Sequence, residues 1–231
     1  MNKNARVSIT GIGCLSASGK SLKENVESLF AGRRNPSAPV GFSSSHPNSY
    51  PVFEIKGEIP EISDSHRINL SRTCQLGLAA AREALKDAGL DTGAMHDLKV
   101  GVCMGTTVGS TMNDEPFYRD FHSSLTPDMS AIDRYLNSNP SSAISREWSL
   151  NGPCQTIVNA CSSGTDAIGI GTSWIRAGIC DIVIAGGADE LSRISYNGFI
   201  SLMITSEEPC CPFDKNRKGL NLGEGGAVLV L

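Results

Sequence analysis

The stretch of the chain with the clearest chemical potential is Ala160-Cys161-Ser162-Ser163-Gly164, which follows the largely apolar run 155–159. The apolar run is typical of a strand and the residues after it are typical of a helix. The pattern predicts a strand that passes through a single residue into a helix. This geometry resembles a nucleophile elbow, a sharp turn that lifts one side chain out of a sheet and aims it at a pocket. We therefore predict that Cys161 is a nucleophile.

The start of the predicted helix would assist that chemistry. A helix N-terminus carries partial positive charge and unpaired N–H groups, both of which favour a thiolate. The same amide groups can hold a developing oxyanion, and removing one such donor typically costs about 2.7–4 kcal/mol. The alternative is a buried structural cysteine. The small residues at 162–164 favour the nucleophile, because they leave room for a substrate and core packing does not need them.

Five short apolar runs predict the strands that must position this segment. They are residues 7–11, 100–105, 155–159, 181–185 and 227–231. The runs are continuous rather than alternating, which is typical of strands covered on both faces. The sequence therefore predicts an α/β fold with a sheet of about five strands, mainly parallel in a mixed sheet, and helices on both faces.

Helical patterns lie between the predicted strands, at residues 21–31, 71–88 and 163–178. The second has Ser71 as its expected N-cap and Gly89 as its stop. The third is apolar almost all round, so we expect it to be buried rather than half-exposed. Residues 35–65 read as a loop with a short hairpin near 52–57.

Residues 106–150 form a polar excursion between strands. Its prolines at positions 116, 127 and 140 are expected to break it into short helices. The excursion does not have the composition of a linker between domains.

Composition excludes several classes of function. The 231 residues are 40% hydrophobic and 19% charged, with a net charge of −4, which argues against nucleic-acid binding by bulk charge. No apolar run approaches the length of a membrane span, and the N-terminus lacks a secretory signal. We therefore expect a cytoplasmic protein with no membrane contact, whose eight cysteines are reduced and mostly buried.

No cofactor or metal is predicted. The adjacent Cys210 and Cys211 suit neither a CxxC switch nor a zinc knuckle. Glycines at 186–187 and 223–226 lack the accompanying residues of a phosphate-binding loop, so close packing is their expected role.

Several separated motifs, in order, resemble the amino-terminal half of a β-ketoacyl synthase, a condensing enzyme of the thiolase-like superfamily. The strongest are VNACSSGTDAIG, DIVIAGGADE and PFDKNRKGLNLGEGGAVLVL, at 158–169, 181–190 and 212–231. The opening VSITGIGCLSASG, the SRTCQLGLAAAREALKDAGL helix and VGVCMGTTVG match the same family. The resemblance implies that residues 1–231 are the amino-terminal domain of a thiolase-like fold, with the carboxy-terminal domain absent from this chain.

The resemblance also assigns roles to residues. Cys161 falls on the active-site cysteine, which takes an acyl group from a carrier thioester, and its backbone N–H supplies part of the oxyanion hole. Val108 and Phe199 fall where the family lines its acyl pocket. Asp214, Arg217 and Glu224 lie in a stretch that we expect to hold the loop before the last strand.

One departure from the family limits the predicted activity. In the family, two histidines and a lysine beyond the cysteine serve the decarboxylation of a malonyl thioester. Here all four histidines precede Cys161; they are His46, His66, His96 and His122. We therefore expect a fragment of a longer enzyme, in fatty-acid or polyketide synthesis, that forms an acyl-thioester on Cys161 and does not condense by itself.

The resemblance implies an acyl carrier protein as partner and a homodimer formed near the strand that leads to Cys161. Carrier proteins are acidic, so the basic groups at 33–34 and 215–218 are candidate docking points. Two alternatives remain: a thiolase-type acyltransferase, and a non-catalytic partner or scaffold subunit of a condensing enzyme. The ACSSGTDA run favours the synthase over the thiolase, and retention of Cys161 argues against the scaffold.

Overall fold

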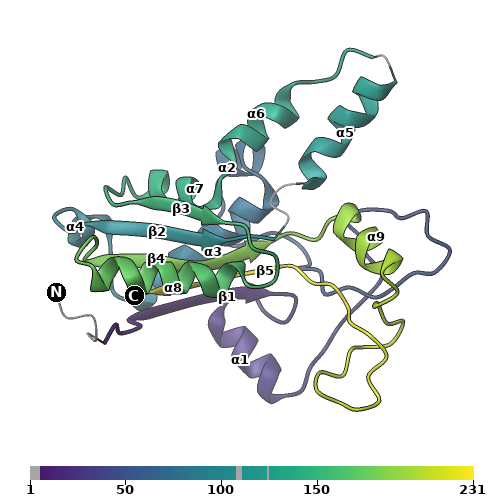
Figure 1. The fold of residues 1–231 in the computed structure, drawn as a ribbon, viewed down its shortest axis with the longest axis horizontal. Coiled ribbons are helices and arrows are strands. Elements are labelled where there is room, and N and C mark those ends of the chain that lie inside the picture. Colours follow the sequence, from purple (N-terminus) through teal and green to yellow (C-terminus); the bar gives the residue numbers. More distant parts are fainter. Residues whose placement is uncertain (1–5, 108–110, 124) are drawn as a thin grey trace.

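The computed structural model of the chain describes residues 6–107, 111–123 and 125–231, with only the backbone at 111–113. Five strands form one sheet in the order β1-β5-β4-β2-β3 (Figure 1). The strands are β1 Gly11–Ser16, β2 Val100–Gly105, β3 Cys154–Ile157, β4 Ile182–Asp189 and β5 Gly225–Val230. The predicted α/β class and the five strands are confirmed.

The sheet is mixed, with two parallel and two antiparallel strand pairs. Strand β2 pairs in parallel with β3 and β4, whereas β5 pairs antiparallel with β4 and β1. The chain leaves β4 and enters β5 at the same end of the strands, where Asp189 lies opposite Gly225. Since no connection returns the chain to the other end of the strands before β5 begins, β5 must run antiparallel to β4. Strands β1, β2, β3 and β4 thus share one direction and β5 alone opposes them, so the prediction of a mixed, mainly parallel sheet is confirmed.

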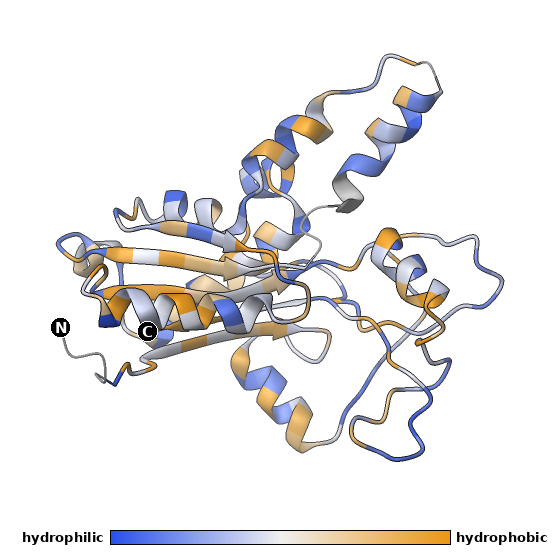
Figure 2. Ribbon diagram, in the orientation of Figure 1, coloured by the Kyte–Doolittle hydropathy of each residue, from blue (hydrophilic) through white to orange (hydrophobic). Residues whose placement is uncertain are grey.

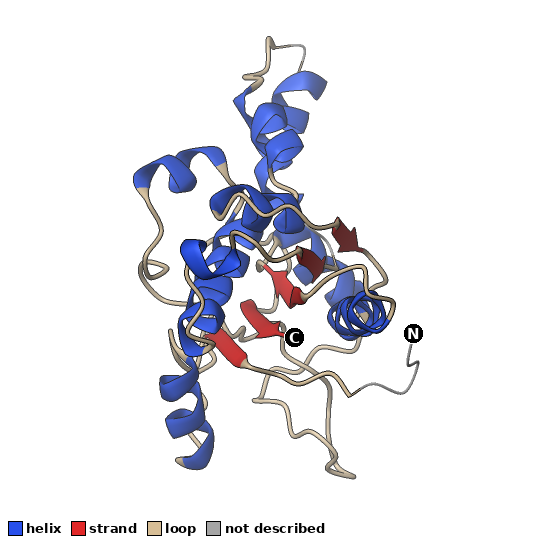
Figure 3. Cartoon of the chain, turned by 90° about the vertical axis from the view of Figure 1, so that its left-hand side faces the viewer, coloured by secondary structure: helices blue, strands red, loops and turns tan. Residues whose placement is uncertain are grey.

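Helices cover both faces of the sheet, as Figures 1 and 3 show from two sides. The helices of the described residues are α1 Leu22–Phe30, α2 Asp64–Asn69, α3 Arg72–Asp87, α4 Thr92–Met95, α5 Thr111–His122, α6 Ser130–Asn137, α7 Pro140–Glu147, α8 Ser163–Arg176 and α9 Arg193–Ser201. Helices α3 and α7 pack on one face, and α8 packs on the other, against β2 and β4.

Helix α3 forms where the sequence predicts it. The Ser71 hydroxyl accepts from the Cys74 N–H, which caps the helix, and Gly89 follows its end with a φ of +67°. The helix lies close to β1, because a Cβ at Gly13 would come within 2.0 Å of the Ala80 carbonyl oxygen. The main hydrophobic core lies between this helix and the sheet, whose central strands are orange along most of their length in Figure 2.

Helix α8 differs from its prediction. Only Ser163, Ala167 and Gly171 are buried, and they face β2 and β4. The apolar side chains Ile170 and Trp174 are only partly buried. The expectation of a helix buried all round was wrong, because within the described residues the sheet covers one side of α8 alone.

Three further local predictions were wrong. The first strand occupies 11–16 rather than 7–11, because β5 has its last paired residue, Val230, opposite Gly11. The expected hairpin at 52–57 is replaced by single bridges from Val52 and Phe53 to distant residues. Pro116 lies inside α5 rather than ending it, whereas Pro140 begins α7 as expected.

All eight cysteines are free thiols, but fewer are buried than predicted. The buried ones are Cys74, Cys103 and Cys180. Burial raises the pKa of the Cys74 and Cys103 thiols to about 11, so these stay protonated at neutral pH. Cys154, Cys161 and Cys211 are exposed. No helix in the described part of the chain is long and apolar enough to cross a membrane.

Candidate active site

The connection from β3 to α8 forms the elbow that carries Cys161. It spans residues 158–162 rather than the single residue predicted. At its centre Ala160 has a φ of +50°, in the left-handed region that is unfavourable for a residue with a Cβ. Such a conformation typically costs about 1–3 kcal/mol and persists only where the surroundings enforce it. Cys161 follows directly and is exposed.

A network of short polar side chains holds this turn. The Ser163 hydroxyl donates to the Ala160 carbonyl oxygen at 2.7 Å and accepts from the Asn159 N–H at 2.8 Å. The Asp166 carboxylate accepts from the Asn159 side-chain amide at 2.7 Å and from the Ser162 hydroxyl at 2.8 Å. These two hydrogen bonds, that from Asn159 first, lower the pKa of Asp166 below its ordinary value. The charged carboxylate therefore stabilises the turn.

Glycines bring the start of α8 against the sheet. A Cβ at Gly105, the last residue of β2, would lie 2.3 Å from the Ser163 carbonyl carbon and 2.4 Å from the Gly164 nitrogen. Across the sheet, Gly187 of β4 approaches the Gly164 Cα. No residue larger than glycine fits at position 105. The close approach of α8 to β2 therefore fixes the position of the elbow relative to the ends of the strands.

Cys161 opens into a cavity of about 350 Å³ at this edge of the sheet. Its walls come from the elbow and from the ends of four strands, β1, β2, β4 and β5; they include Leu15, Gly105, Thr107, Gly187, Asp189 and Gly226. Small side chains and backbone groups make up much of this lining. The thiol is therefore not part of the packed core, as a structural cysteine would be.

The structure separates the three predicted site residues. Cys161 lines the cavity. Phe199 lies on α9, is half-buried, and is not among the described residues that line this cavity. Val108 lies outside the described residues. The acyl-pocket role of Phe199 and Val108 thus stays a prediction.

The histidines lie away from Cys161. His66 pairs with Glu147, with 3.2 Å between Nε2 and Oε2, and the exposed His96 lies beside Asp97. Among the described residues that line the Cys161 cavity, there is no histidine.

Sequence reasoning missed a polar contact beside the elbow. Asp189, at the end of β4, accepts through Oδ1 from the Thr106 hydroxyl at 2.7 Å and the Thr107 N–H at 2.8 Å. The Thr107 hydroxyl in turn donates to the Ala160 carbonyl oxygen at 3.1 Å. The sequence contains only a partial signal: Thr106 directly follows the predicted strand 100–105, whereas Asp189 lies beyond the predicted strand 181–185.

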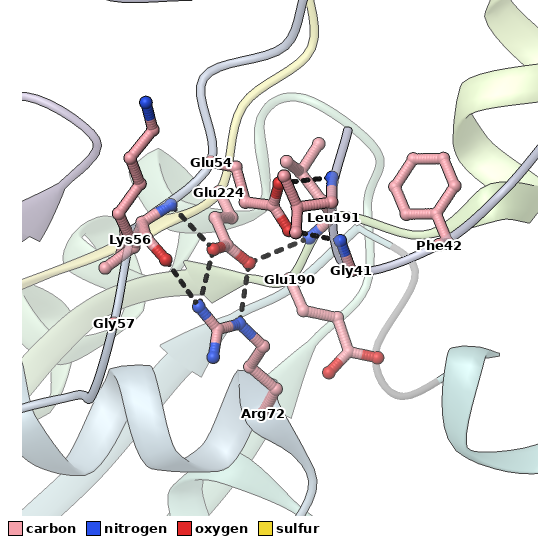
Figure 4. Close-up of a pocket in the computed structure, with 11 residues that line it drawn as sticks. Gly41, Phe42, Glu54, Lys56, Gly57, Arg72, Glu190, Leu191 and Glu224 are labelled. Carbon is pink, nitrogen blue, oxygen red and sulfur yellow. Dashed lines mark hydrogen bonds and ion pairs between the residues drawn. The ribbon is translucent and has the colours of Figure 1, made fainter. Parts of the chain in front are cut away.

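A second cavity, of about 620 Å³, lies near an internal ion pair (Figure 4). The buried Glu224 carboxylate accepts from Arg72 at 2.8 and 2.7 Å and from the N–H groups of Ile55 and Leu191 at 2.9 and 3.3 Å. Glu224 thus joins α3 to the loops before α2 and α9. These contacts agree with the structural role expected for it.

Comparison with known proteins identifies the family. The model of the Beta-ketoacyl synthase, N-terminal domain, matches residues 4–231. The ketoacyl synthase alpha subunit of the tetracenomycin polyketide synthase of Streptomyces glaucescens is 35% identical over 98% of this chain and 57% of its own length. The 3-oxoacyl-(acyl-carrier-protein) synthase 2 of Staphylococcus aureus strain COL is 28% identical over 100% of this chain and 58% of its own.

Solved structures agree. A β-ketoacyl synthase from Burkholderia phymatum superposes with a TM-score of 0.80 at 29% identity, covering 97% of this chain and 58% of the other. The ishigamide ketosynthase/chain length factor gives 0.83 at 27% identity, covering 96% and 57%. The chain spans somewhat more than half the length of the relatives it matches. From its motifs, fold and relatives, the chain belongs to the β-ketoacyl synthase family and matches the amino-terminal domain.

Proposed function

We propose that this chain provides the acyl-accepting half of a β-ketoacyl synthase, with Cys161 as the acceptor. The Cys161 sulfur attacks the carbonyl carbon of an acyl thioester on a carrier protein. A new carbon–sulfur bond to Cys161 forms as the bond to the carrier sulfur breaks. The carrier thiol leaves with the proton that Cys161 has given up. The product is an acyl-thioester on Cys161.

The observation that carries this proposal is the exposed Cys161 on a strained elbow at the start of α8, opening into a cavity. An exposed thiol beside a cavity can be reached by an acyl thioester. The Cys161 N–H stabilises the negative charge that develops on the thioester oxygen. The family match supports this acyltransferase chemistry and leaves the thiolase alternative without support.

The second half-reaction needs two histidines that the given sequence does not have beyond Cys161. The family places two histidines and a lysine there for the malonyl thioester, and the sequence from 162 to 231 contains no histidine. We therefore propose that a carboxy-terminal half supplies them, either as a continuation of the polypeptide or as a separate chain. The 231 residues alone accept an acyl group and do not form a carbon–carbon bond.

The proposed partner is an acyl carrier protein, which the name of the Staphylococcus relative includes. Two basic groups far apart in sequence support a docking face. Arg34 donates to the Cys210 carbonyl oxygen at 2.6 Å, so the first group adjoins the loop that carries the second, Lys215, Arg217 and Lys218. An acidic carrier surface would complement this face.

We also propose that the chain pairs with a second copy through β3. This strand lies at the edge of the sheet, and no strand of the described residues pairs with its outer side. A related partner subunit is the alternative occupant of this edge, because two of the similar structures are described as a ketosynthase with a chain length factor.

Intact-mass measurement tests the acyl acceptor. The chain is incubated with the N-acetylcysteamine thioester of butyric acid, and the adduct is located by peptide mapping. We expect one butyryl group on Cys161, no adduct for Cys161→Ala, and an unchanged adduct for the control Cys211→Ala. Addition of a malonyl thioester is expected to yield no β-ketoacyl product. An unmodified chain, or an adduct that survives Cys161→Ala, contradicts the proposal.

A further inference from the structure

The end of β2 is tied directly to the peptide that precedes Cys161. The Thr107 hydroxyl donates to the Ala160 carbonyl oxygen at 3.1 Å, from the rim of the cavity. Thr107 is itself held, because its N–H donates to Asp189 at the end of β4. The elbow is thus connected through one threonine side chain to two central strands of the sheet.

This contact bears on the direction of the Cys161 N–H. The Ala160 carbonyl and the Cys161 N–H belong to one planar trans peptide group, so they point in opposite directions. A hydrogen bond that fixes the carbonyl therefore fixes the N–H as well. The two further donors to the carbonyl, the Ser163 hydroxyl and N–H, belong to the start of α8 and move with it. Among the described residues, only Thr107, two residues beyond β2, supplies a donor from outside α8.

Backbone strain at Ala160 makes the orientation of its peptide group depend on the hydrogen bond from Thr107. Ala160 holds a φ of +50°, which a residue with a Cβ rarely adopts. With fewer restraints the peptide can rotate toward more favourable angles, and its N–H then turns away from the position of the oxyanion. Fixed donors are valuable in catalysis because they need no reorganisation when charge develops.

We propose that Thr107 is a positioning residue for acyl transfer: its hydroxyl orients the peptide whose N–H stabilises the oxyanion beside Cys161, and Asp189 holds Thr107 in place. The inference rests on the proposed function, since it concerns the same thiol. It adds a specific device that the sequence motif around Cys161 does not contain.

Two reactions at the same sulfur separate positioning from general damage. Transfer of butyryl from its N-acetylcysteamine thioester passes through an oxyanion. Alkylation by iodoacetamide displaces iodide at a saturated carbon and forms no oxyanion. The ratio of the two rates at Cys161, measured by peptide mass spectrometry on the full chain, reports the oxyanion donor and cancels changes in thiol exposure.

Three variants form the test. Thr107→Val removes the hydroxyl and keeps the size and branching of the side chain, whereas Thr107→Ser restores the hydroxyl. Thr10→Val is the matched control, because the Thr10 hydroxyl also donates to a backbone carbonyl, that of Val230 at 3.3 Å, far from the elbow in sequence and in the sheet. We expect Thr107→Val to lower the acylation-to-alkylation ratio about tenfold. Thr107→Ser and Thr10→Val should stay within about twofold of the parent chain.

Each other outcome is decisive. An unchanged ratio in Thr107→Val, with normal acylation of the parent chain, overturns the role of Thr107 and leaves the proposed function standing. An equal fall of both rates assigns Thr107 to general stability and also overturns the inference. A parent chain that is alkylated but never acylated at Cys161 overturns the proposed function, and the inference with it.

Discussion

The proposed reactive position, Cys161, depends on a few residues with short polar side chains. The Ser163 hydroxyl donates to the carbonyl oxygen of the strained Ala160. The Asp166 carboxylate accepts hydrogen bonds from the side chains of Asn159 and Ser162. The Ser162 N-cap makes no side-chain cap bond to the helix, because its hydroxyl is engaged with Asp166 and Asn159. The turn before α8 is therefore stabilised by a carboxylate within the first turn, where the helix dipole also favours negative charge.

This network makes stability depend on pH at the acid end. Hydrogen bonds to its charged form lower the pKa of Asp166, so its contribution is present above the ordinary carboxyl value of 3.8 and is lost as pH falls through the lower folded value. We expect Asp166→Asn to unfold at lower urea concentration than the parent chain above about pH 5, and the difference to shrink below pH 3.8. A difference that persists unchanged in acid contradicts this origin.

At the scale of elements, the site exists because α8 starts almost in contact with β2. Gly105 permits that approach, and the core on that face is a small cluster between α8 and the sheet. Helix α8 also contains Gly169, whose Cβ position meets nothing within 4 Å. Packing therefore requires glycine at position 105 but not at position 169.

Paired substitutions test this distinction. Gly105→Ala forces the start of α8 away from β2, so we expect a loss of about 1–3 kcal/mol in the free energy of unfolding and slower acylation of Cys161. Gly169→Ala removes backbone freedom from the unfolded chain without a clash, and is expected to add about 0.5–1 kcal/mol. Urea unfolding of both variants provides the measurement. A harmless Gly105→Ala is the result that the packing argument does not allow.

Local signals allowed some elements to be predicted and not others. Helix α3 was predictable because its cap at Ser71 and its stop at Gly89 lie within the helix sequence itself. The limits of β1 depended on where β5 ends opposite it, which the β1 residues do not encode. The burial of α8 depended on what covers its outer side, so apolarity alone overestimated it.

The same reasoning explains the site. Cys161 was predictable because its strand, turn and helix are contiguous in the sequence. The Thr107–Asp189 contact was not, because it requires β2 and β4 to be neighbours and Thr107 to reach the elbow after β3. Residue types at strand ends suggest such contacts, but strand order decides which of them form.

For the whole molecule, the open edge at β3 is the place where a second chain can extend the sheet. Val102 of β2 donates to the Pro153 carbonyl oxygen, so in this parallel pair the Cys154 N–H points away from β2. An edge with free donors pairs readily with another strand.

A substitution at Cys154 tests the proposed dimer. Proline there removes the outward N–H and leaves the bonds between β2 and β3 in place, so we expect Cys154→Pro to be monomeric. The control Cys154→Ala keeps the N–H and should remain dimeric. Sedimentation equilibrium distinguishes the two masses. A parent chain that stays monomeric at all concentrations rules out pairing with a second copy and leaves a different partner subunit for this edge.

The most direct test of the central claim compares the three exposed thiols within one chain. Cys154, Cys161 and Cys211 are all exposed, but only Cys161 lies on the elbow and lines the cavity at the start of α8. Site-resolved mass spectrometry after brief exposure to a butyryl thioester gives the acyl occupancy of each. The account predicts an occupancy at Cys161 at least about tenfold above the other two. Equal occupancy, or a higher value at Cys154 or Cys211, would contradict it.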